Sequence, residues 1–166
     1  INQIEKNIDY YGMYISQLKV DGFATIKRNL FGQPLITYKL LESDILRIKN
    51  SINLISDILI GSGAEEIIYP YENFNVLKSK KEIDSLINTF DLSKMNFVCA
   101  HMMSSCAMGN NGKQVVDIYG NLLGEKNISV VDASIIPECT GESPQLTIMT
   151  MAKRLIEIKK TLNFKF

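Results

Sequence analysis

The carboxyl-terminal part of the chain contains the stretch Thr140-Gly141-Glu142-Ser143-Pro144-Gln145-Leu146-Thr147-Ile148-Met149, which predicts where a final helix begins. Ser143 is a suitable N-cap, and Pro144 suits the first helical position, where no backbone N–H is needed. The periodicity predicts an inward apolar stripe of Leu146, Met149, Ala152 and Ile156. The cations near the end of the helix suit its dipole: Lys153, Arg154, Lys159 and Lys160.

Two apolar runs upstream of this helix lead into residues that could take part in catalysis or cofactor binding. The run 127–131 is expected to be a buried strand that ends at Asp132 and Ala133, and the run 96–100 a buried strand that leads into His101. His101 is the only histidine of the chain. Because an imidazole has an unperturbed pKa of about 6.5, acid–base chemistry near neutral pH is expected to centre on it. The alternative is a structural histidine at the end of a strand.

Four segments in one order resemble the carboxyl-terminal signature of the glucose-methanol-choline (GMC) flavoprotein oxidoreductases, with most similarity to the cholesterol oxidase and long-chain alcohol oxidase branch. They are His101–Gly109, Val115–Gly120, Asn127–Pro137 and Thr140–Met149. The resemblance implies an α+β fold, in which an antiparallel sheet with packed helices forms the substrate side. It also implies that residues 1–114 are a substrate-side domain with the histidine, and that residues 115–166 are a strand, loop and helix that pack on an FAD-binding domain missing from this sequence.

The same resemblance implies the chemistry of an FAD-dependent oxidoreductase that acts on the CH–OH group of a relatively apolar alcohol. In that mechanism the flavin accepts a hydride, His101 takes the hydroxyl proton, and Ser143 orients the substrate oxygen. The cofactor contacts that the resemblance implies are Asp132, Ala133, Pro144, Gln145 and Leu146.

The chain also departs from the pattern of the family that it resembles. Ser143 stands where the family usually has histidine or asparagine, Ser104 where it usually has glycine, and Ala107 where it often has arginine. These departures keep open a degenerate, non-catalytic module for binding or interaction. Simpler roles also remain open for single residues: Ser143 as an N-cap alone, Asp132 as the cap of a turn, and the final helix as a packing element.

A phosphate-binding loop is not found in this sequence. The stretch 61–66, Gly-Ser-Gly-Ala-Glu-Glu, follows a predicted helix and is expected to terminate it, and no Gly-x-Gly-x-x-Gly occurs. The family's FAD-binding half is therefore expected in an upstream part of the same gene product or in a companion chain. The sequence begins with Ile1 and not with Met, which favours a fragment or a processed piece.

The first half of the chain predicts a hairpin and two helices. Residues 26–30 and 35–40 are short β-leaning runs on either side of a turn at 31–34, and residues 22–25 lead into the first run. One helix is predicted from Ser43 as N-cap to Gly61 or Gly63, and a second from Ser79, where Glu82 completes a capping box. The first is expected to bury Ile45, Ile48, Ile52, Ile55 and Leu59, and the second Ile83, Leu86, Ile87 and Phe90.

Composition limits the partners and the location. With 18 basic and 18 acidic residues, no global charge favours nucleic acid, and no apolar run reaches the length of about 20 residues that a transmembrane helix needs. Three cysteines cannot all pair within one chain, which favours a reducing, cytoplasmic location, although peripheral membrane association stays open. The spacing of Cys99, His101, Cys106 and Cys139 is not a usual metal pattern, so no metal is expected.

Overall fold

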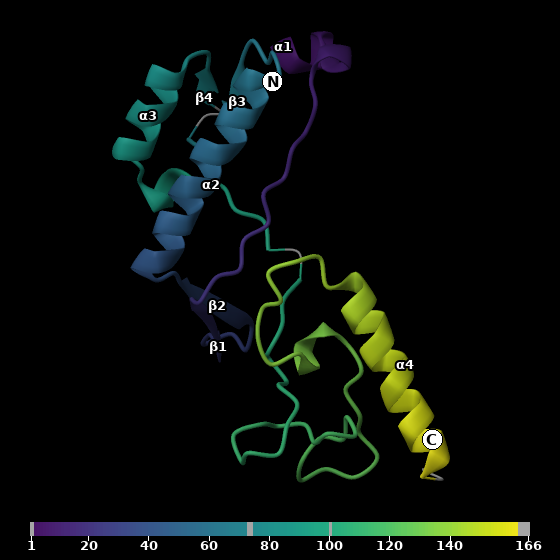
Figure 1. Cartoon of the computed structure of the whole chain (residues 1–166). Helices are drawn as coiled ribbons and strands as arrows, with labels where there is room; N and C mark the ends of the chain where they lie inside the picture. Colours follow the sequence, from purple (N-terminus) through teal and green to yellow (C-terminus); the bar gives the residue numbers. More distant parts are fainter. Residues whose placement is uncertain (1, 73–74, 100, 163–166) are drawn as a thin grey trace.

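The computed structural model describes residues 2–72, 75–99 and 101–162 (Figure 1). It is a mixture of helices and two small antiparallel sheets, which agrees with the predicted α+β class. The helices and strands are α1 (Asn2–Lys6), β1 (Phe23–Arg28), β2 (Pro34–Lys39), α2 (Glu42–Gly61), β3 (Ile67–Tyr69), β4 (Asn75–Leu77), α3 (Lys80–Asn88) and α4 (Gln145–Thr161). Short 3-10 turns cover Ile8–Tyr10, Leu92–Lys94 and Ala133–Ile135.

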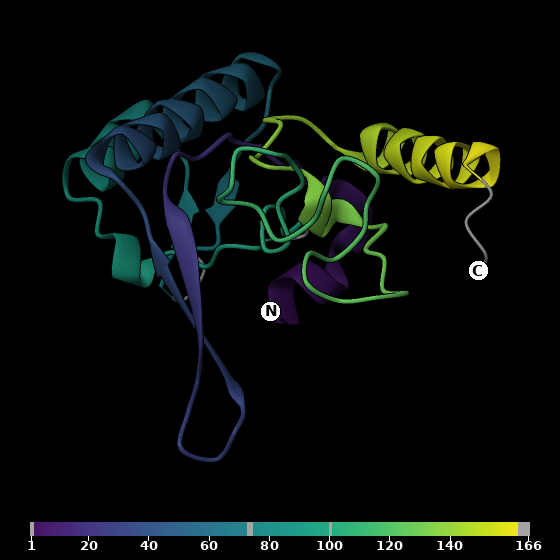
Figure 2. The ribbon, with the colours of Figure 1, turned by 90° about the horizontal axis from the view of Figure 1, so that it is seen from below.

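The predicted hairpin of β1 and β2 is confirmed. Its strands pair antiparallel, with Ile26 opposite Ile36 and Ala24 opposite Tyr38. The side chain of Asn29 shapes the turn, because its Oδ1 accepts hydrogen bonds from the N–H groups of Phe31 and Gln33, both at 2.9 Å. Figure 2 shows the hairpin as an arm that projects away from α2, α3 and α4.

A first hydrophobic cluster joins α2 and α3 to the β3–β4 sheet. The apolar stripes predicted for both helices face this cluster, with Ile48, Ile52, Ile83 and Leu86 buried and Ile55, Leu59, Ile87 and Phe90 partly buried. Ile45 is partly buried but is not part of the cluster. The capping box of α3 is confirmed, since Glu82 N–H donates to Ser79 Oγ and Ser79 N–H donates to Glu82 Oε2. Gly63, with φ +95°, lies just beyond the end of α2, so the glycine stretch does terminate this helix.

The β3–β4 hairpin was not predicted from the sequence. Its two strands have three residues each, too few for an alternating pattern to stand out. The predicted N-cap Ser43 is also wrong: α2 begins at Glu42 with Leu41 as its N-cap, because the backbone N–H of Leu41 donates to the carboxylate of Asp44 at 2.9 Å.

A second hydrophobic cluster lies in the carboxyl-terminal half, around Val116, Ile135, Ile136 and Leu155. It includes partly buried Met103, Cys106 and Met108, which precede residue 114. The division between residues 114 and 115 stays a prediction.

The predicted inner stripe of α4 is wrong. Leu146 and Met149 are 75% and 62% exposed, and Ile156 is exposed too. The buried side is offset around the helix and consists of Ile148, Met151, Leu155 and Lys159, with Ala152 at its border. The periodicity was read correctly as helical, but α4 carries apolar residues on two sides, and only contact with the second cluster decides which side is inward.

The two apolar runs predicted as buried strands are also wrong. Residues 96–99 are exposed and have no strand assignment, and Ala100 lies outside the described residues. The run 127–131 makes only an isolated bridge from Ser129 to Asn121 and is exposed or partly buried. A strand needs a neighbour for its backbone hydrogen bonds, and the described residues place no full strand beside either run.

The accessible surface is large for the mass. It measures 12608 Å² for 18.7 kDa, whereas a compact monomer of this mass is expected to expose about 8300 Å². Among the described residues, none of the helices is both long and apolar enough to cross a bilayer.

Candidate functional site

His101 lies in an exposed segment without regular structure. A few residues later this segment joins the second cluster, where Cys106 N–H donates to Ser134 O at 3.1 Å and Met108 N–H donates to Ile135 O at 2.9 Å. The motif that begins with His101 therefore runs beside the 3-10 turn Ala133–Ile135. Two of the sequence-predicted site segments are held together in this way.

Asp132 caps that 3-10 turn. Its Oδ1 accepts hydrogen bonds from the hydroxyl and the backbone N–H of Ser134, the latter at 2.8 Å. These hydrogen bonds, the hydroxyl contributing most, hold the pKa of Asp132 below its ordinary value. Its carboxylate thus has the capping role that the sequence left open as an alternative. Ala133 is half-buried at the start of the turn, and a cofactor contact through either residue stays a prediction.

The start of α4 holds the other predicted site residues. Pro144 is buried and is the N-cap, so the helix begins at Gln145, one residue later than expected. Ser143 is exposed and lies before the cap, which contradicts its predicted N-cap role. Since Pro144 has no side-chain acceptor, it leaves the first N–H groups of the helix without a side-chain cap. Gln145 and Leu146 are exposed in this first turn.

The segments of His101, Ala133 and α4 meet in the second cluster, because Met103, Ile135 and Ile148 all pack there. No hydrogen bond joins His101 to Ser143 in the part of the chain that the structure describes. The pairing of His101 with Ser143 at one site stays a prediction.

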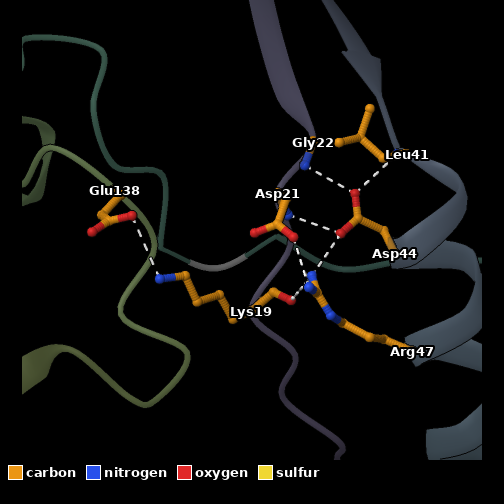
Figure 3. Close-up of polar contacts among 7 residues, drawn as sticks. All are labelled: Lys19, Asp21, Gly22, Leu41, Asp44, Arg47 and Glu138. Carbon is orange, nitrogen blue, oxygen red and sulfur yellow. Dashed lines mark hydrogen bonds and ion pairs between the residues drawn. The ribbon is translucent and has the colours of Figure 1, made fainter.

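The base of the β1–β2 hairpin approaches the segments that lead to these residues. Lys19 Nζ lies 3.5 Å from Glu138 Oε2 in the loop before α4 (Figure 3). On β2, partial desolvation raises the pKa of the half-exposed Tyr38, and negative charge on Cys99, Cys139 and Asp44 raises this pKa further. Cys99 precedes His101 by two residues, and Cys139 precedes α4. The hairpin base thus lies near the loop that leads into α4.

The buried carboxylate of Asp44 holds the base of the β1–β2 hairpin in place, and this role was not predicted from the sequence. Asp44 is fully buried and accepts hydrogen bonds from the backbone N–H groups of Asp21, Gly22 and Leu41 at 2.8 to 2.9 Å (Figure 3). Arg47 donates to it at 3.1 Å and to Asp21 at 2.6 Å. An aspartate in the first turn of a helix is a known signal for local capping, but contacts with Asp21 and Gly22 have no local sequence pattern.

Metal ligands do not gather in the described ranges. No group of three or more His, Cys, Asp or Glu side chains there is placed to hold an ion. The three cysteines are free thiols.

Comparison with known proteins identifies the family. The sequence profile of the GMC oxidoreductases matches residues 20–152, which is most of the chain. The chain belongs to the GMC oxidoreductase family. The family resemblance seen in its sequence is thereby confirmed, and the matched range includes His101, Ser143 and the first turn of α4.

Individual relatives are longer than this chain. An uncharacterized GMC-type oxidoreductase of Sinorhizobium fredii is 29% identical over 150 residues, which cover 88% of this chain and 30% of the relative. An oxygen-dependent choline dehydrogenase of Proteus mirabilis is 29% identical, covering 75% of this chain and 22% of the relative. A long-chain-alcohol oxidase of Arabidopsis thaliana is 29% identical, and the match covers 70% of this chain and 18% of the relative. This GMC oxidoreductase chain thus spans less than a third of these relatives, and no solved structure matches it.

Proposed function

We propose that the chain is the carboxyl-terminal portion of an FAD-dependent oxidoreductase that acts on the CH–OH group of an apolar alcohol. The observation that carries this proposal is the family membership over residues 20–152, a range that contains the lone histidine. Two of the named relatives are an oxygen-dependent choline dehydrogenase and a long-chain-alcohol oxidase, and both names describe oxidation of an alcohol.

The residues present suit a flavin. The amino terminus of α4 has first-turn N–H groups that Pro144 does not cap, and a helix amino terminus favours negative charge. Pro144, Gln145 and Leu146 would lie against the ring system, and the backbone at Asp132 and Ala133 would meet the ribityl and phosphate part. FAD, when bound, supplies the hydride acceptor.

His101 would hold the proton of the reaction. Its imidazole is exposed, so a substrate hydroxyl can approach it, and a neutral ring nitrogen is a suitable acceptor near neutral pH. Ser143 would orient the alcohol oxygen through its hydroxyl, which both donates and accepts. Its reach is shorter than that of the asparagine or histidine usual in the family, so the substrate would have to lie closer.

The chain would do this together with an amino-terminal FAD-binding half. The accessible surface of 12608 Å² exceeds the expectation for a compact monomer by about 4300 Å². That excess is larger than the roughly 1200–2000 Å² that a standard specific interface buries. The three free thiols support a cytoplasmic location for the assembly.

Reconstitution with the FAD-binding half tests the proposal. We expect anaerobic addition of a long-chain primary alcohol to bleach the flavin absorbance. His101→Gln should slow this bleaching by about 100-fold or more while FAD stays bound. His101→Ala with added imidazole should recover part of the rate, which separates a proton acceptor from a structural side chain. Bleaching at an unchanged rate in both variants would contradict the role of His101.

A degenerate, non-catalytic module is the second candidate, and one observation favours it. Ser104 has φ +63°, in the left-handed region that glycine adopts without strain, and it stands where the family usually has glycine. Strain in the motif of His101 would fit a scaffold retained after activity is lost. FAD binding without any alcohol-dependent bleaching, over alcohols of several chain lengths, would support this candidate.

A further inference from the structure

The β1–β2 hairpin carries a contiguous apolar face. Paired residues share a face of a sheet, so Ala24, Tyr38, Ile26 and Ile36 lie on one side, and the pair of Arg28 and Pro34 follows on the same side toward the turn. Ile26 is 57% exposed, Ile36 48% and Tyr38 49%. The opposite face alternates Thr25, Thr37, Lys27 and Lys39 with Phe23 and Leu35, and is mixed in character.

The hairpin has little support of its own in water. No other described strand pairs with β1 or β2, and of their residues only Thr25 is even partly buried. Isolated two-stranded hairpins are at best marginally stable, and an exposed apolar strand surface promotes association. A protein domain packed on the Ala24–Tyr38 and Ile26–Ile36 face would stabilise the hairpin and shield its apolar residues from water.

The position of this face in the structure indicates which partner covers it. The base of the hairpin lies near the loop before α4: Lys19, three residues before Gly22, lies 3.5 Å from Glu138, and a Cβ built at Gly141 would lie 3.1 Å from Lys19 Cβ. A body seated on the candidate site is therefore beside the face as well. The relatives that match this chain have 70 to 82% of their length outside the matched part, which is ample for such a body.

We propose that the apolar face of the hairpin, formed by Ala24, Ile26, Ile36 and Tyr38, is a docking surface for the FAD-binding half. This inference rests on the proposed function for its partner. It goes further by naming the surface that holds the two parts together, at a distance in sequence from the signature that binds the cofactor. The face with Thr25 and Thr37 is not part of this contact.

Co-purification of the chain with a tagged FAD-binding half tests the docking surface. The double variant Ile26→Asp/Ile36→Asp should weaken association by about 100-fold or more, because two charges would be buried against apolar surface. The matched control Thr25→Asp/Thr37→Asp places the same charges at adjacent positions of the same strands, on the other face. It should change the affinity by no more than about threefold.

Hydroxyl-radical footprinting of the wild-type chain gives a second measurement that needs no variant. Addition of the FAD-binding half should reduce oxidation of Ile26, Ile36 and Tyr38 by about fivefold or more, with Phe23 and Leu35 changed less than about twofold. Equal protection of both faces, or unchanged binding by the double variant, would overturn the docking surface.

The two proposals fail in different ways. If the double variant binds and its flavin bleaches as in the wild type, the docking surface is wrong and the proposed function stands. If the wild type docks through the hairpin but no alcohol bleaches the flavin, the docking surface stands and the proposed function fails. If the wild-type chain does not associate with the FAD-binding half, both are wrong.

Discussion

Asp44 accepts a hydrogen bond from the backbone N–H of Gly22 at 2.9 Å, which joins the first turn of α2 to the start of the β1 arm. Burial alone raises the pKa of Asp44, but hydrogen bonds from the N–H groups of Asp21, Leu41 and Gly22, with the charge of Arg47, hold it below its ordinary value. The ionised carboxylate is thus the form that the fold stabilises.

Replacement of this carboxylate should destabilise the fold. Asp44→Asn should lower the free energy of unfolding by about 2–4 kcal/mol, because an amide nitrogen cannot accept the N–H groups that both carboxylate oxygens now satisfy. Urea unfolding followed by circular dichroism measures this. Glu42→Gln, an exposed change in the same helical turn, should have an effect within about 0.5 kcal/mol.

The pH dependence of the free energy of unfolding should report the ionisation of Asp44. Its folded pKa lies below the unfolded value of about 3.9, so its contribution is present above that pH and is lost as pH falls through the folded pKa. The difference in unfolding free energy between wild type and Asp44→Asn should therefore shrink below about pH 4. A constant difference from pH 7 to pH 3 would contradict this assignment.

Gly22 should not tolerate a side chain. A Cβ built at Gly22 would lie 2.3 Å from Lys39 O and 3.0 Å from Asp44 Oδ2. Gly22→Ala should cost about 2 kcal/mol or more, since the strand backbone must shift. Gly61→Ala is the matched control: it lies at the end of α2, no atom is found within 4 Å of its built Cβ, and we expect a neutral or slightly stabilising effect. Thermal unfolding of both variants compares them directly.

Lys159 should be a structural lysine. It is buried on α4, where its Nζ donates to Asn121 Oδ1 and to Ser129 Oγ at 2.6 Å. Lys159→Met keeps the apolar stem but leaves these acceptors without their donor, which should cost about 1–3 kcal/mol. Lys160→Met, at the exposed next position, should be nearly neutral. Equal unfolding midpoints for the two variants would contradict the role of Lys159.

Ser104→Gly should stabilise the chain. A non-glycine residue at φ +63° is strained by about 1 kcal/mol, and glycine removes this strain at some entropic cost to the unfolded chain. We expect a net gain of a few tenths to about 1 kcal/mol in urea unfolding. Ser105→Gly, at an exposed position where no positive φ is found, should be neutral or destabilising.

Ser143→Asn should raise activity if Ser143 contacts the substrate oxygen. The longer amide side chain adds a donor, and one recovered hydrogen bond corresponds to a gain of about 2- to 10-fold in the rate of flavin bleaching by alcohol. Stopped-flow reduction of the reconstituted enzyme measures it. Because Ser143 is exposed and does not cap α4, stability should stay unchanged, which separates this effect from a folding effect.

Sequence alone predicted the elements whose signals are local. The hairpin around residues 31–34, the capping box of Ser79 and Glu82, and the end of α2 all depend on residues a few positions apart. The GMC family was also recognisable from sequence, because its carboxyl-terminal signature is a linear order of motifs.

Only the tertiary structure decided which apolar surfaces are covered. It turned Leu146 and Met149 outward, left residues 96–99 exposed, and buried Asp44 and Lys159 with partners far away in sequence. A side chain's environment depends on which distant segments pack against it, and apolar periodicity is the same for a core stripe and for a surface that binds another body. Hydrogen bonds between distant segments leave no spacing in the sequence from which they could be read.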